Sequence, residues 1–291
     1  MYKDFFHFNQ DPFNNTPNHH LLFLSPQHEE ALESMVYGIK QRKGFIAIIG
    51  DIGTGKTTLC RSLLQRIQNH VNTAVIFNPM LSVPELLLAI NDDFGLKSST
   101  DRSIKSQIDA LNRFLLTRLK QNQNAVVIID EAQHLTTEAF EMLRMLSNLE
   151  TEDKKLLQII FVGQRELEGK LASPELKQLN QRISIRYYLK PLNFQETCGY
   201  IVHRLALVSQ ECSVQFEETA LKRVYKHSGG VPRIINNLCD RALLDAYAER
   251  QHTITKKTIR RVILDLNGAS NPHDSFFFKK IDFSAWRRVF G

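Results

Sequence analysis

The chain has 291 residues, of which 43% are apolar, and a formal net charge of +6; this length and apolar content suffice for a buried core in one large domain or two smaller ones. The moderate positive charge permits contact with nucleic acid or anionic lipid without requiring either, and the four scattered cysteines show no metal-ligand spacing, which favours reduced thiols in a cytosolic protein. The chain lacks both a secretory signal and the ~20 consecutive apolar residues of a membrane span, so we expect a soluble or membrane-peripheral protein.

The chain begins with a segment rich in aromatic residues, FFHFNQDPFNNTP. We expect residues 1–24 to form a linker and latch whose aromatic side chains pack on the core of the domain that follows. Direct contact with a partner protein is the alternative.

A phosphate-binding motif follows. The apolar run GFIAIIG predicts a strand, and it leads into GDIGTGKTTL, which fits G-x-x-x-x-G-K-[ST] and precedes a predicted amphipathic helix. Glycines let backbone N–H groups converge on a phosphate at the helix N-terminus, where Lys56 would neutralise the β- and γ-phosphates and Thr57 would ligate Mg²⁺. The motif therefore predicts binding of ATP and Mg²⁺ by Gly50, Asp51, Ile52, Gly53, Thr54, Gly55, Lys56, Thr57 and Thr58.

Further strands are predicted along residues 25–192, which we interpret as one α/β domain with a parallel sheet. TAVIFNPM contains Asn78 near its end, and NAVVIIDEAQHL brings Asp130 and Glu131 to the carboxyl end of a buried strand. Asp130 would hold Mg²⁺ through water and Glu131 would polarise the attacking water. A solvated strand end is the alternative for the acidic pair. The string DEAQ also occurs in helicases, but the chain shows no further helicase motif.

Two strands complete the domain. LLQIIFVGQREL carries Gln164 after its apolar run, and ISIRYYL is preceded by Arg182. A polar side chain at the position of Gln164 can sense the γ-phosphate, although glutamine or asparagine at a strand end is also a common turn former.

Residues 193–267 change to a helical pattern, with apolar residues three and four positions apart in four segments. Asn193 and Thr255 are expected helix caps, and the string GGVPR ends one helix at Gly229 and begins the next at Pro232. This pattern predicts a small all-helical lid domain.

A polar, turn-rich linker and the tail DSFFFKKIDFSAWRRVFG occupy residues 268–291. Aromatic residues mixed with lysine and arginine suit a segment lying on an anionic membrane surface through residues 275–291. Burial against the lid and docking to a partner are the alternatives.

Several segments of residues 1–267 resemble the ExeA/GspA family, the AAA+ ATPases of the general secretion pathway. They are the opening residues through GTGKTTLCRSLL, then VGQREL, QLNQRISIRYYLKPL, ETCGYIVHRL and GGVPRIINNLCDRAL. The family is related to ATPases of pilus biogenesis (MshM) and of transposition (TniB/TnsC). Arg165 departs from the family, which usually has proline there, and longer members continue into a transmembrane helix and a peptidoglycan-binding domain.

The resemblance implies roles for four further residues. In AAA+ proteins Asn78 would restrain the catalytic glutamate and Gln164 would sense the γ-phosphate. Arg182 would reach the nucleotide of a neighbouring subunit, a role for which Arg165 and Arg186 are rivals, and Arg233 would contact the nucleotide from the lid.

The resemblance also implies what the protein does. We expect a cytoplasmic ATPase, forming a ring of identical subunits, that assembles the type II secretion secretin with a GspB-like membrane partner, or serves a pilus. A DNA-associated regulator of transposition is the alternative, and an ATP-binding switch with negligible hydrolysis is a third interpretation.

Overall fold

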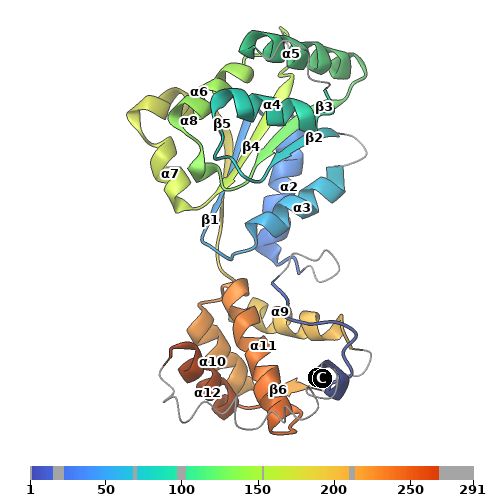
Figure 1. Cartoon of the computed structure of the whole chain (residues 1–291), viewed down its shortest axis with the longest axis vertical. Coiled ribbons are helices and arrows are strands. Elements are labelled where there is room, and N and C mark those ends of the chain that lie inside the picture. Colours follow the sequence, from blue (N-terminus) through green and yellow to red (C-terminus); the bar gives the residue numbers. More distant parts are fainter. Residues whose placement is uncertain are drawn as a thin grey trace, which may run out of the picture. The chain divides into compact units, whose positions relative to one another are not determined.

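The computed structural model describes residues 2–15, 23–67, 71–96, 103–152, 154–209 and 214–268. The chain divides into two compact units. One is Leu24–Lys190, and the other combines Met1–Phe23 with Pro191–Gly291. The predicted tail at residues 269–291 lies outside the described residues. Figure 1 labels most of the helices and strands of the two units.

The first unit is built on a five-stranded parallel sheet with the order β2-β3-β4-β1-β5. Its strands are β1 (Phe45–Gly50), β2 (Val71–Ile76), β3 (Asn124–Ile129), β4 (Leu157–Gly163) and β5 (Ile183–Leu189). The apolar runs of β1 and β4 are buried at every position, as expected for central strands that are covered on both faces. The sheet confirms the predicted α/β class.

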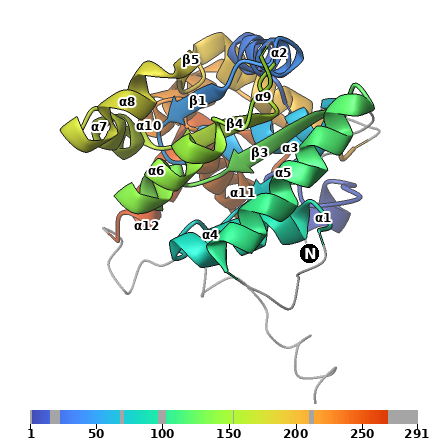
Figure 2. The ribbon, with the colours of Figure 1, turned by 90° about the horizontal axis from the view of Figure 1, so that it is seen from above.

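Helices cover both faces of this sheet, because alternate strand residues point to opposite sides. Ile46 and Ile48 pack with α2 (Pro26–Lys40) and α3 (Lys56–Ile67). Phe45 and Ile49 point into the opposite core, and Figure 2 shows α4, α5 and α6 gathered on one side of β3 and β4. That layer contains α4 (Val83–Asp93), α5 (Ile104–Lys120), α6 (Thr137–Leu146), α7 (Arg165–Leu171) and α8 (Lys177–Gln181), with the 3-10 turns η2 (Ala132–His134) and η3 (Pro174–Leu176).

The second unit is mainly helical, as predicted. It contains α9 (Phe194–Ala206), α10 (Glu218–Ser228), α11 (Pro232–Ala248) and α12 (Lys256–Leu266), and also the short parallel pair β6 (Gln215–Phe216) and β7 (Thr253–Ile254) that the helical pattern missed. Asn193 and Thr255 cap α9 and α12 by accepting backbone N–H bonds, which confirms both predicted caps. Gly229 ends α10 in the left-handed conformation at φ 58°, as the glycine pair predicted.

The N-terminal aromatic segment packs within this helical unit, and the expectation that it covers the nucleotide-binding core is wrong. Tyr2, Phe6, Phe8 and Phe13 are buried in one cluster with residues of α9, α11 and α12. The buried Arg204 of α9 adds two hydrogen bonds, from Nε to the carbonyl oxygen of Pro12 (2.5 Å) and from Nη2 to that of Asn14 (2.7 Å). The sequence indicated that the aromatic side chains become buried, but composition carries no information about which unit receives them.

No helix within the described ranges is both long and apolar enough to cross a lipid bilayer.

Candidate active site

The strand order brings three loops to the carboxyl edge of the sheet. The loop after β1 carries the phosphate-binding motif, the loop after β3 carries Asp130 and Glu131, and the loop after β4 carries Gln164. Because β4 lies between β3 and β1, these loops are neighbours in space. Ligands of open α/β sheets bind at this edge.

The loop after β1 has the shape of a phosphate cradle. Gly53 and Gly55 have φ angles of 79° and 100°, which a side chain disfavours. The loop is closed by a hydrogen bond of 2.8 Å from Thr54 Oγ1 to the carbonyl oxygen of Asp51. It ends at the first turn of α3, where free backbone N–H groups and the helix dipole favour an anion.

Lys56 folds back over this loop. Its Nζ donates to the carbonyl oxygens of Gly50 (2.8 Å) and Asp51 (2.9 Å). Burial lowers the pKa of Lys56, and the nearby carboxylates of Glu131, Asp130 and Asp51 partly offset that effect. The ammonium group is thus held at the loop where phosphate oxygens would lie.

Thr57 and Asp130 form an oxygen-rich pair across the site. Thr57 Oγ1 donates to Asp130 Oδ2 at 2.7 Å, and Asp130 is only 3% exposed. A hydroxyl and a carboxylate oxygen are hard donors of the kind that Mg²⁺ prefers beside substrate phosphates. The residues present therefore fit the predicted metal.

Glu131 is held by two amide side chains. Its Oε2 accepts from Gln164 Nε2 (2.9 Å) and from Gln133 Nε2 (2.5 Å). Burial raises the pKa of Glu131, but these two hydrogen bonds and the charges of Lys56 and His134 outweigh burial and lower it. Glu131 is therefore ionised near neutral pH, the state that a general base requires.

Asn78 has a different place from the one expected. It is exposed, and its Oδ1 accepts from the backbone N–H of Met80 at 3.3 Å. The amides bonded to Glu131 are those of Gln164 and Gln133. The structure thus gives Asn78 the contact of a turn former, which was the alternative for a polar residue at a strand end.

Arg182 and Arg233 lie in different units. Arg182 is exposed at the end of α8, and its Nη1 donates to Asn148 Oδ1 (2.5 Å) and Ser147 Oγ (3.3 Å) at the end of α6. Arg233 is exposed in the first turn of α11 in the helical unit.

Arg165, the departure from the family pattern, now has a defined contact. Its Nε lies 2.8 Å from Asp51 Oδ1 and its Nη2 lies 3.2 Å from Asp51 Oδ2. This two-point pairing links the loop after β4 to the phosphate-binding loop, a geometry that suits arginine better than lysine. The Arg165 side chain is 76% exposed, so water weakens the pair.

His28 of α2 supports the phosphate-binding loop, and sequence reasoning missed it. Its Nε2 lies 3.1 Å from the carbonyl oxygen of Thr54, and its Nδ1 lies 2.7 Å from Ser25 Oγ. Because a carbonyl oxygen only accepts, Nε2 carries a proton. A Cβ at Gly55 would lie 2.9 Å from His28 Nε2, so the glycine makes room for the ring. In the sequence, Ser25 followed by Pro26 indicates only the start of a helix; it does not predict a contact between His28 and a distant loop.

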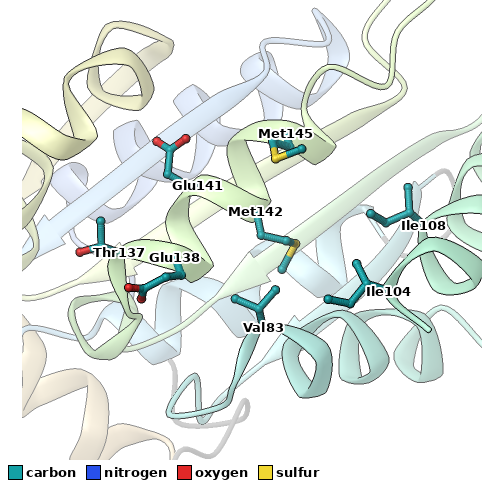
Figure 3. Close-up of a pocket in the computed structure, with 8 residues that line it drawn as sticks. All are labelled: Val83, Ile104, Ile108, Thr137, Glu138, Glu141, Met142 and Met145. Atoms are coloured by element: carbon teal, nitrogen blue, oxygen red, sulfur yellow. The ribbon is translucent and has the colours of Figure 1, made fainter. Parts of the chain in front are cut away.

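A separate cavity of about 420 Å³ lies between α4, α5 and α6 (Figure 3). Its lining is mainly apolar and consists of Val83, Ile104, Ile108, Thr137, Glu138, Glu141, Met142 and Met145. None of these belongs to the loops that carry Lys56, Asp130 and Gln164. The cavity is therefore distinct from the candidate active site.

Comparisons with known proteins agree with this architecture. Residues 39–171 match the AAA domain family. The chain is 41% identical to General secretion pathway protein A of Aeromonas hydrophila over 268 residues, which is 92% of this chain and 49% of that protein. The chain thus spans about half the length of this curated relative.

Solved structures share the fold at low sequence identity. The ORC2 protein of Aeropyrum pernix, in ADPNP–ADP complexes, is 17% identical with a TM-score of 0.64, covering 91% of this chain and 74% of that one. Cdc6p of Pyrobaculum aerophilum is 14% identical with a TM-score of 0.66, covering 89% and 71%. The Thermotoga maritima RuvB branch migration motor is 19% identical with a TM-score of 0.58, covering 85% and 74%.

Proposed function

The chain has the AAA+ fold and an AAA domain, and it is similar to a general secretion pathway protein A; from this premise we propose that it is an ATPase that binds ATP with Mg²⁺ and hydrolyses it. One observation carries the proposal. Three loops meet at one edge of the sheet: the loop after β1 carries Lys56 and Thr57, the loop after β3 carries Asp130 and Glu131, and the loop after β4 carries Gln164, which bonds to Glu131.

Each group has a part in phosphoryl transfer to water. The loop amides and Lys56 would bind the phosphates of ATP, and Thr57 and Asp130 would hold Mg²⁺, which would neutralise charge on the phosphate oxygens. Glu131 accepts a proton from a water molecule while the oxygen of that water bonds to the γ-phosphorus. The bond from that phosphorus to the bridging oxygen breaks, and ADP and inorganic phosphate leave. Gln164, beside Glu131, orients the water and senses the γ-phosphate.

We propose that the active site is completed by a neighbouring subunit in a homo-oligomeric ring. Arg182 is exposed on the nucleotide-binding unit, where it would add positive charge to the nucleotide of the next subunit. Such an arginine typically increases the rate by ~10³–10⁵. Arg233 would contact the nucleotide from the helical lid.

A mixing experiment tests the ring. Arg182→Ala lacks the arginine but keeps Glu131 as the base, and Glu131→Gln lacks the base but keeps Arg182. Each variant alone should therefore be nearly inactive. Mixed rings would pair an intact base with an intact arginine, and turnover should return. A mixture that stays as inactive as its components would contradict a shared active site.

The similarity to a general secretion pathway protein A supports a role in assembling an envelope machine. We propose that the protein works in the cytoplasm, at the inner-membrane face, with a GspB-like partner or a pilus component, and that residues 275–291 contact anionic lipid. Turnover should rise or oligomer size should change with this partner or with anionic vesicles. A response to duplex DNA alone, with steep salt dependence, would instead support a regulator of transposition.

A further inference from the structure

Gln133 is a buried amide to which the functional proposal assigns no role of its own. It lies in η2, directly after the acidic pair, and is 8% exposed. Its Nε2 donates to Glu131 Oε2, and its Oε1 accepts from the backbone N–H of Gln164 at 3.2 Å. Since a carboxylate accepts and a backbone N–H donates, this orientation of the amide satisfies both ends, and a flipped amide would satisfy neither.

The surroundings of Gln133 fix its position. Lys170 of α7 donates from Nζ to the carbonyl oxygens of Gln133 (2.7 Å) and Leu135 (2.6 Å), which holds the backbone of η2 against α7. Gly163, the last residue of β4, leaves room for the side chain, because a Cβ there would lie 2.7 Å from Gln133 Oε1. The position of the Gln133 amide is therefore fixed by contacts with β4, η2 and α7.

The contacts of Gln133 and Gln164 converge on a single oxygen. Both Nε2 groups donate to Oε2 of Glu131, so these two bonds leave Oε1 for a water molecule. The backbone of Glu131 is in the left-handed region, at φ 52° and ψ 37°. A non-glycine residue stays in that conformation when its surroundings over-determine it, and such residues cluster at active sites.

We infer that Gln133 is the positioning residue of the catalytic carboxylate: together with Gln164 it holds Glu131 by Oε2 and presents Oε1 to the attacking water, the restraint that the family pattern assigned to Asn78. This inference rests on the proposed ATPase function. Gln164 directly follows β4, and its backbone N–H holds the side chain of Gln133. The end of β4 therefore positions both Gln133 and Gln164, the residue expected to sense the γ-phosphate.

The test is the substitution Gln133→Met, which keeps length and volume but has no N–H donor. Loss of a hydrogen bond to a charged group predicts a fall in kcat of about tenfold to hundredfold, with KM for ATP changed less than about threefold, since the phosphate-binding loop is untouched.

Gln158→Met is the matched control. Gln158 is a buried glutamine of β4 (0% exposed) whose side-chain oxygen and nitrogen lack hydrogen-bond partners among the described residues. This variant introduces the same side chain into the same unit and should keep the wild-type kcat and KM for ATP.

The outcomes separate the inference from the function on which it rests. Wild-type kcat in Gln133→Met, beside an inactive Glu131→Gln, would overturn the role of Gln133 alone. An equal loss of kcat in Gln158→Met would also overturn it, since the effect would then be general. Absence of ATP turnover in the wild-type protein would overturn the proposed function and this role together.

Discussion

Replacing Phe6 by alanine tests whether the N-terminal segment is part of the helical unit. Phe6 is 0% exposed, and its ring centroid lies 4.8 Å from that of Phe5, 5.5 Å from that of Phe8 and 5.6 Å from that of His252. His252 comes from the far end of the sequence, just before β7. The Phe6 side chain therefore joins the N-terminal segment to the residue that precedes β7.

The magnitude follows from this burial. A Phe→Ala change in a core costs about 3–5 kcal/mol, from lost transfer free energy and the cavity that remains. Phe6 directly follows the four-residue helix α1 (Tyr2–Phe5) and is the first of two turn residues. This short segment can relax toward the cavity, so we expect a loss of about 3 kcal/mol. Domains are stable by only about 5–15 kcal/mol, and the variant should therefore unfold its helical unit at a much lower denaturant concentration.

Hydrogen exchange resolved by residue is the appropriate assay, because it reports each unit separately. Amides of α9, α11 and α12 should lose protection in Phe6→Ala, while those of β1, β3 and β4 keep it. The matched control is Phe77→Ala, at a side chain that is 53% exposed, which should change stability by less than about 0.5 kcal/mol. Unchanged protection in the helical unit of Phe6→Ala would refute the packing argument.

Three further predictions concern the nucleotide-binding unit. His28→Leu removes the hydrogen bond to the Thr54 carbonyl oxygen, so titration with nucleotide should show weaker binding by about tenfold; wild-type affinity would show that the loop does not need this support. Arg165→Ala breaks an exposed pair with Asp51 and should change the free energy of unfolding by less than about 1 kcal/mol, whereas a loss above about 2 kcal/mol in chemical denaturation would show that water does not weaken the pair. Burial and a hydrogen bond to a carboxylate raise the pKa of Tyr187 from 10.0 to about 12, so this tyrosine contributes stability that is present below pH 10 and is lost as pH rises through 12. The free energy of unfolding, measured by denaturation across that pH range, should decline less steeply in Tyr187→Phe than in the wild type. An identical decline in both proteins would contradict the raised pKa of Tyr187.

Much of the site could be predicted from the sequence because apolar runs indicate where the strands end. Lys56, Asp130 and Gln164 each follow an apolar run, and the carboxyl ends of parallel strands share one edge of a sheet, so their proximity could be inferred. Asn78 also follows a strand, yet its contact is with Met80. A strand end gives the edge of the sheet on which a residue lies, but the loop backbone decides which way its side chain turns.

Other contacts could not be predicted, because they join segments whose spacing in the sequence carries no signal. His28 reaches Thr54 from another helix, and the pairing of Arg165 with Asp51 spans two loops. Gln133 was visible in DEAQ, but its role depends on the room left by Gly163. Each of these contacts depends on the tertiary arrangement of helices, strands and loops, which the sequence pattern does not specify.

The most direct measurement of the central claim is phosphate release by Glu131→Gln, made beside ATP binding by the same variant. Glutamine keeps the shape of the side chain but cannot accept the proton of water, so we expect ATP binding within about threefold of wild type and a turnover reduced by at least about a hundredfold. Wild-type turnover in Glu131→Gln would contradict the account, because the carboxylate held by Gln133 and Gln164 would then have no part in hydrolysis.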